Sequence, residues 1–213
     1  HFILSVTSPD REAAVTADGG SLTLPDSYVA ISSGAGSIIG DLSTISLCFN
    51  DVTNTTEVNC AAKIGDTSFG YVGKTWPTSR KIGRAVVFGS NDFGFFHVSI
   101  GAEPTVTLTL YGKQGAAPSS STDGTVIGTG SAVDTNNESA GRTINSTDLV
   151  TSWDHVWIRS TYSGGGTIVS FHDIAEVVFY EFIPGGTFGL GGASTIYRPT
   201  TTPYLCVVLA PVA

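Results

Sequence analysis

The sequence is poor in charged residues, and in basic residues above all. Asp, Glu, Lys and Arg make up 13% of the 213 residues, about half of the share that is usual in globular proteins. Only 10 residues are Lys or Arg, against 18 that are Asp or Glu, so the net charge is −8. Because no cluster of basic residues is available to neutralise phosphates, nucleic-acid binding is not expected.

The sequence also lacks long apolar runs and methionine, and its number of cysteines is odd. No apolar run approaches the ~18 residues that span a bilayer, so membrane insertion is not expected. The absence of methionine leaves His1 as a product of processing or as the first residue of a trimmed chain. There are three cysteines: Cys48 and Cys60 would close a short loop, Cys206 would staple the C-terminal tail, or the thiols are buried and free.

What the chain does contain is typical of many short strands joined by turns. It has 26 Gly and is rich in Ser and Thr. The segment PTVTLTLYGK alternates cleanly, with Val106, Leu108 and Leu110 on one side, which predicts a half-buried strand. Segment 43–51 also predicts a strand, and segment 154–173, with SGGG in its middle, predicts a hairpin. The fold class expected is all-β, an antiparallel β-sandwich or jelly roll.

Composition divides the chain into three parts. Residues 1–40 are expected to form an N-terminal β extension or the first strands, and residues 41–183 the sandwich. Residues 184–213 are rich in Gly and Pro and end in YLCVVLAPVA, which predicts a C-terminal extension with a terminal strand. We expect this extension to dock on the sandwich or on a neighbouring chain.

Over residues 45–181, several motifs in order resemble the discoidin, or coagulation-factor type C, domain. The motifs are CFNDVTNTT, GYVGKTW, IGRAVVFGSND, VTLTLYGKQGAAPSSSTDGTVIGT, WDHVWIRS and IAEVVFYE. The resemblance is closest to copies found in phage virion proteins and in carbohydrate-binding modules. It implies a galactose-binding-like jelly roll whose ligands meet the loops at one end.

The resemblance also implies a structural Ca²⁺ near the early turn. The matching positions are Asp51 and Glu176, with Thr56 nearby. Carboxylates and turn carbonyls are the oxygen ligands that Ca²⁺ prefers. The alternative is that Asp51 caps its own turn and that Glu176 is solvated. The turn reads Asp51-Val52 where the family's fuller form has Asp-Gly, which weakens the calcium prediction.

The loops implied to bind the ligand are 90–103 and 134–147. Sugars stack on aromatic faces, while amides, Arg and carboxylates hold their hydroxyl groups. The candidate ligand-binding residues are Trp76, Asn91, Asp92, Phe93, Phe95, Phe96, His97, Glu138 and Arg142. The alternative is core packing, in which most of these aromatic rings close the end of the sandwich and one or two remain for contact.

These observations favour a non-catalytic structural and adhesion protein of a phage-type virion, extracellular or part of the virion. Its partners would be a glycan or cell-surface ligand and other assembly subunits, as a homo-oligomer. One alternative is a free-standing secreted carbohydrate-binding module. Another is a copper enzyme resembling lytic polysaccharide monooxygenases, in which His1 would bind Cu(II) with His97, His155 or His172.

Overall fold

The structure is a computed structural model that describes residues 15–18, 21–31, 34–63, 69–189, 193–197 and 206–209. It divides into two compact units, one of residues 30–182 and the other of residues 1–29 together with 183–213. The larger unit begins N-terminal to residue 41, because β4 (Ser37–Gly40) pairs with β6 (Phe69–Arg80) inside it.

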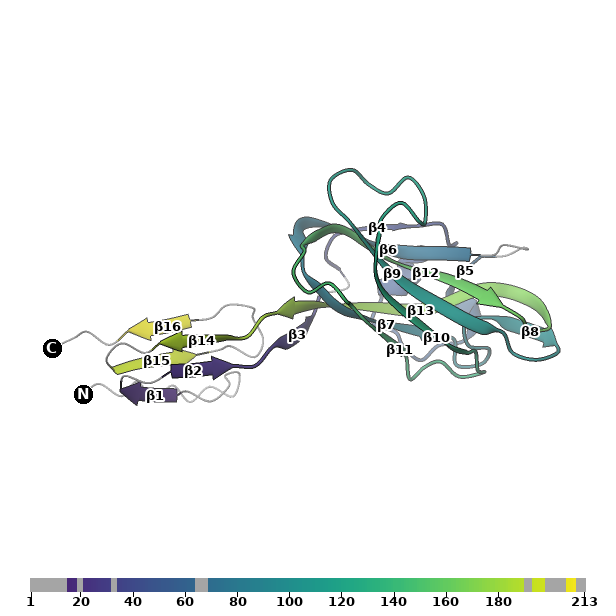
Figure 1. Cartoon of the computed structure of the whole chain (residues 1–213). Helices are drawn as coiled ribbons and strands as arrows, with labels where there is room; N and C mark the ends of the chain where they lie inside the picture. Colours follow the sequence, from purple (N-terminus) through teal and green to yellow (C-terminus); the bar gives the residue numbers. More distant parts are fainter. Residues whose placement is uncertain are drawn as a thin grey trace. The chain divides into compact units, whose positions relative to one another are not determined.

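The larger unit is a sandwich of two antiparallel sheets (Figure 1). The first sheet has the order β10 (Thr125–Val133), β9 (Thr105–Lys113), β12 (Trp153–Ser163), β6 and β4. The second contains β11 (Arg142–Asn145), β7 (Ile82–Gly89) and β13 (Thr167–Ile183), with β5 (Ala61–Lys63) and β8 (His97–Ile100) also paired to β13. Two short 3₁₀ helices, η1 (Ile45–Phe49) and η2 (Glu57–Asn59), precede β5. The prediction of an all-β antiparallel sandwich is confirmed.

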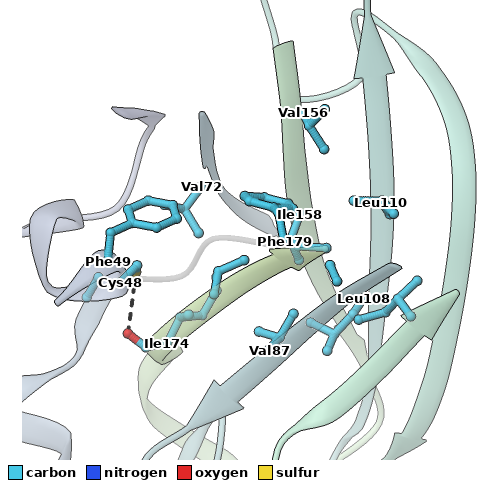
Figure 2. Packing of buried hydrophobic residues seen from close by; sticks show 14 of the residues in the cluster. Cys48, Phe49, Val72, Val87, Leu108, Leu110, Val156, Ile158, Ile174 and Phe179 are labelled. Carbon is cyan, nitrogen blue, oxygen red and sulfur yellow. Dashed lines mark hydrogen bonds between the residues drawn. The ribbon is translucent and has the colours of Figure 1, made fainter. Parts of the chain in front are cut away.

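The core lies between the two sheets and follows the alternation seen in the sequence. On β9, Val106, Leu108 and Leu110 are at most 2% exposed, as a strand with one face on the core requires. Figure 2 shows Leu108 and Leu110 facing residues of the opposite sheet, such as Val87 and Phe179. The period-2 pattern therefore predicted both the strand and its buried face.

Two local predictions were wrong. Segment 43–51 forms η1 where a strand was predicted, and it buries the consecutive residues Cys48 and Phe49, which an alternating strand would send to opposite faces. Segment 154–173 is not a hairpin, because β12 belongs to the first sheet and β13 to the second. The glycines between them, Gly164 and Gly165, have φ values of 70° and 89° and carry the chain from one sheet to the other.

The two cysteines of the larger unit are buried free thiols. Cys48 donates to the carbonyl of Ile174 at 3.5 Å, the contact drawn in Figure 2. Burial raises the pKa of the Cys60 thiol to about 12, helped by the nearby charges of Asp173, Asp92 and Glu57. A disulfide through Cys206 lies outside the described side chains.

The smaller unit is built from both ends of the chain. β15 (Ala193–Tyr197) lies between β1 (Val15–Asp18) and β16 (Cys206–Leu209) in one antiparallel sheet. β14 (Gly186–Gly189) pairs with β2 (Ser21–Leu24) in another. The Asp26 carboxylate accepts a hydrogen bond from the Gly185 amide at 2.7 Å. The strand expected in the last ten residues is therefore β16, paired with β15. β3 (Ser27–Ala30) ends at the boundary between the two units.

Candidate ligand-binding loops

The segment between β7 and β8 is a tight turn held by Ser90. The Ser90 hydroxyl accepts from the Phe93 amide at 3.1 Å and donates to the Gly94 carbonyl at 3.0 Å. Gly94 has φ +71°, and a Cβ atom there would lie 2.1 Å from the carbonyl oxygen of Thr135. Only glycine combines this backbone conformation with so close an approach. The turn is thus fixed against the loop that follows β10.

A buried carboxylate ties the same turn to that loop. The two oxygens of Asp134 accept the Phe95 amide at 3.0 Å and the Phe96 amide at 3.1 Å. Burial raises the pKa of Asp134 to about 7, against the lowering effect of these two hydrogen bonds, and the negative charges of Glu138 and Glu103 add to the rise. Nothing in the sequence singled out Asp134, because it is an ordinary Asp at the end of a strand.

Three of the aromatic candidates are core residues. Phe95 and Phe96 are fully buried and Trp76 is 4% exposed, so none of them offers a ring face to a sugar. Phe96 packs against Tyr162 and Trp76 packs edge-on against Phe179. For these three residues, core packing replaces the predicted ligand contact.

Phe93 and His97 remain at the surface, half-buried. Their rings stack with centroids 3.6 Å apart and an interplanar angle of 11°. Nδ1 of His97 lies 3.0 Å from Oε2 of Glu57, an ion pair when the imidazole is protonated, though not a hydrogen bond in this orientation. The Asp92 carboxylate in turn accepts the Glu57 amide at 2.9 Å. Sequence reasoning missed Glu57, which carries no motif and reaches the turn only through η2.

Asn91 completes this surface from the other side. The backbone amide of Asn91 donates to the Thr55 carbonyl at 2.9 Å, and its side-chain NH₂ donates to Oδ1 of Asn54, also at 2.9 Å. The turn and the segment before η2 are therefore bound together. We refer to the side chains gathered there as the loop cluster: Asn54, Glu57, Asn91, Asp92, Phe93 and His97.

Glu138 and Arg142 form an ion pair next to this region. Glu138 is joined to the turn through its backbone, whose amide donates to the Ser90 carbonyl at 3.2 Å. Arg142 also donates to the Val133 carbonyl at 3.0 Å, and it lines a pocket of about 220 Å³ between β9, β10 and β11. The structure thus brings four of the nine predicted ligand residues into the loop cluster. It places Arg142 at the pocket between β9, β10 and β11.

Two of the predicted metal ligands, Glu176 and Asp51, meet at the turn that follows η1. Oε2 of Glu176 accepts the Asn50 and Asp51 amides at 3.0 and 2.9 Å, while Oε1 is buried without a hydrogen-bond partner. Burial raises the pKa of Glu176 to about 7, and the negative charge of Asp51 contributes to the rise. An orphaned carboxylate oxygen beside a second carboxylate fits a hard cation. Thr56, in contrast, is exposed, and its carbonyl already accepts the Asn59 amide at 2.9 Å.

The histidines named for a copper site are engaged elsewhere. Both ring nitrogens of His155 have partners, the Thr75 hydroxyl at 2.7 Å and the Gly115 carbonyl at 2.9 Å. His172 is fully buried in β13 and packs against Phe96. His1 lies outside the described residues. Within the described part of the chain, no three His, Cys, Asp or Glu residues lie together so that they could hold a metal ion.

Comparison with solved structures finds family 32 carbohydrate-binding modules, which are galactose-binding-like domains of the class that the sequence resembles. A module of Clostridium perfringens NanJ in complex with galactose is 14% identical, with a TM-score of 0.49; the match covers 72% of this chain and 99% of that one. A two-module structure of C. perfringens ZmpB is 16% identical, with a TM-score of 0.47, and the match covers 72% of this chain and 37% of that one. Its complex with GalNAc is 15% identical, with a TM-score of 0.45, and the shares are 72% and 36%.

No protein-family model matches the chain, and no curated protein matches its sequence. In the part of the chain that the structure describes, no helix has the length and apolar character needed to cross a membrane.

Proposed function

We propose that the sandwich is a non-catalytic glycan-binding module and that its loop cluster is the binding site. The observation that supports this most is the surface stack of Phe93 on His97 with the Glu57 carboxylate 3.0 Å from the imidazole. A surface aromatic ring supplies apolar contact to the C–H face of a sugar, while adjacent carboxylates and amides accept and donate hydrogen bonds to its hydroxyl groups. Such a module acts outside the cell.

The rigidity of the turn favours binding. Gly94 approaches the Thr135 carbonyl closely, and Asp134 holds the two amides that follow it. Side chains that are already fixed lose little conformational freedom when a ligand arrives. A weak ligand such as a monosaccharide gains most from this preorganisation.

A glycan array followed by titration calorimetry tests the proposal, with galactose and GalNAc, the ligands of the similar modules, as first probes. Phe93→Ala and His97→Ala are each expected to weaken binding roughly tenfold, because each removes half of the stack. Val150→Ala, at a residue that is 80% exposed and outside the loop cluster, is the control and should bind as the natural chain does. An array without a hit, or full binding by Phe93→Ala, would contradict the proposal.

We also propose that Glu176 and the turn before it hold a structural Ca²⁺. The buried, partnerless Oε1 of Glu176 and the nearby Asp51 carboxylate support this assignment. Millimolar CaCl₂ should raise the melting temperature of the natural chain by several degrees and leave Glu176→Gln unchanged. Equal shifts in both proteins, or no shift in either, would rule the site out.

The smaller unit supports a second role, in assembly within a virion or another multi-subunit particle. Among the described strands, β16 lies at one edge of the sheet β1–β15–β16, and an edge strand can pair with a strand of another chain. Light scattering should therefore find a homo-oligomer, and deletion of residues 206–213 should return it to the monomer. A chain of residues 1–213 that is monomeric would exclude this role, without bearing on glycan binding.

A further inference from the structure

The first sheet of the sandwich has an outer face that the loop cluster does not use. Strand alternation sends Val72 and Ile158 into the core and turns their neighbours outward. The strand register then places the outward residues in rows across the sheet. One row is Tyr71, Arg159, Thr109 and Thr129, and the next is Phe69, Thr161, Thr107 and Ser131.

The segment 114–124 covers one half of this face. The Trp157 ring nitrogen donates to the Ser121 carbonyl at 2.8 Å, and Tyr111 stacks on Trp157 at 5.3 Å. Both aromatic rings are buried although they lie outside the core. The two rows named above lie beyond segment 114–124, so the covered half of the sheet face ends at Arg159. We refer to these eight residues as the sheet shelf.

Arg159 has an unsatisfied guanidinium at the edge of the cover. Its Nε donates to the Ser121 hydroxyl at 3.2 Å, and its guanidinium carbon lies 5.0 Å from the centre of the Phe69 ring. In the described part of the chain it has no acidic partner. These two contacts fix the side chain but leave its terminal nitrogens without an acceptor among the residues that the structure describes.

The other cations near the shelf are neutralised. Lys63 pairs with Asp41 at 2.5 Å and Lys113 pairs with Asp123 at 2.6 Å. Among the described residues, the uncompensated positive charge of the shelf therefore belongs to Arg159. A planar guanidinium whose two terminal nitrogens form a free edge suits a carboxylate better than any neutral group.

The rest of the shelf is an array of hydroxyl groups, of which those of Thr107 and Ser131 bond each other at 2.9 Å. Thr129 and Ser131 are exposed, and Thr107, Thr109 and Thr161 are half-buried. Neighbouring strands lie about 4.8 Å apart, and side chains on one face repeat about every 6.8 Å along a strand. Hydroxyls on this lattice can exchange hydrogen bonds with several hydroxyls of one sugar chain, while the half-buried Tyr71 ring offers an apolar edge beside Arg159.

We propose that the sheet shelf is a second binding site, for a glycan that carries a carboxylate, with Arg159 binding the carboxylate group. Both uronic acids and sialic acids supply this chemistry. The site is separate from the loop cluster, since no residue of that cluster lies on β6, β9, β10 or β12.

Affinity electrophoresis of the full chain tests the site. Gels containing polygalacturonate are compared with gels containing its methyl ester, which has the same sugar backbone without the charge, and sialyllactose is titrated separately. The natural chain should be retarded by polygalacturonate or bind sialyllactose, and it should ignore the ester. Arg159→Gln should weaken the interaction roughly tenfold or more.

The matched control is Lys81→Gln, which removes one positive charge from the turn between β6 and β7 and should bind normally. Phe93→Ala should also bind normally, because it affects only the loop cluster, so failure of one site does not count against the other. Equal binding by Arg159→Gln, equal loss in Lys81→Gln, or no response to either carboxylated probe would overturn the proposal.

Discussion

Gly94 holds the turn of the candidate site against the loop that follows β10. Its φ is +71°, and a Cβ atom would meet the Thr135 carbonyl at 2.1 Å. Gly94→Ala should therefore lower the free energy of unfolding by about 2 kcal/mol or more, from backbone strain together with a clash against rigid backbone. Urea denaturation measures this directly.

Gly164 is the matched control for Gly94. Its φ is +70°, yet nothing lies within 4 Å of the Cβ position. Gly164→Ala should lose only the backbone contribution, about 1 kcal/mol. If the two variants lose the same amount, the close packing of the turn against the 134–142 loop is not what makes glycine necessary at residue 94.

Asp134 makes stability depend on pH. Its pKa is raised from its ordinary value to about 7, so the folded chain holds a proton that the unfolded chain has released above about pH 4. Stability from this group is therefore fully present below the unfolded pKa and is lost as pH rises toward 7, by up to about 1.4 kcal/mol per pH unit.

Asp134→Asn removes this contribution. Between pH 5 and pH 7.5, the natural chain should lose on the order of 2 kcal/mol more unfolding free energy than the variant does. Urea denaturation at both pH values, with EDTA present to keep metal out of the comparison, gives the difference. Parallel pH profiles for the two proteins would show that Asp134 titrates as an ordinary exposed carboxyl.

At the level of elements, the sequence predicted strands better than it predicted their partners. Alternation in 105–113 defined β9 and its buried face, because period 2 is a property of one strand alone. After β12, the chain can form a hairpin by pairing the next strand with β12, or it can cross to the other sheet. The SGGG segment permits both, and contacts between residues far apart in the sequence decide between them. The η1 segment was misassigned because five residues are too few to separate a strand from a helical turn by period.

The candidate site was foreseen only in part, for the same reason. The cluster of Phe residues after a turn indicated an end of the sandwich, and Phe93 and His97 do lie at its surface. Glu57 and Asp134 come from segments 36 residues before and 41 residues after Phe93. Only the three-dimensional packing shows that they meet the same turn, so no local pattern could have found them.

Strand β10 carries a pair of glycines whose roles the structure separates. A Cβ atom at Gly130 would touch Ile144 at 3.5 Å, an ordinary contact beside the pocket between β10 and β11. Gly130→Ala should therefore raise the free energy of unfolding by about 0.5–1 kcal/mol, through reduced freedom of the unfolded chain. Gly128→Ala should lower it, because its Cβ would lie 2.5 Å from the Asn145 carbonyl. Urea denaturation of both variants would contradict this assignment if they changed in the same direction.

For the whole molecule, the division into two compact units has a thermodynamic consequence. The sandwich, residues 30–182, has its own core of large buried side chains, while the described residues of the smaller unit form a two-stranded and a three-stranded sheet. Small sheets of this size are marginal by themselves. Calorimetry should therefore resolve two transitions, with the smaller unit unfolding at the lower temperature.

A ligand makes the same division testable, because it stabilises only the unit that binds it. At a sugar concentration 100 times its Kd, the sandwich should gain about 2.7 kcal/mol and the upper transition should shift upward by a few degrees. The lower transition should stay in place, and in Phe93→Ala, whose Kd is about tenfold higher, the upper transition should gain only about 1.4 kcal/mol and shift about half as far. A single transition that shifts as a whole would mean that the two units fold as one cooperative body, and stability changes measured in any of the variants above would then report on both.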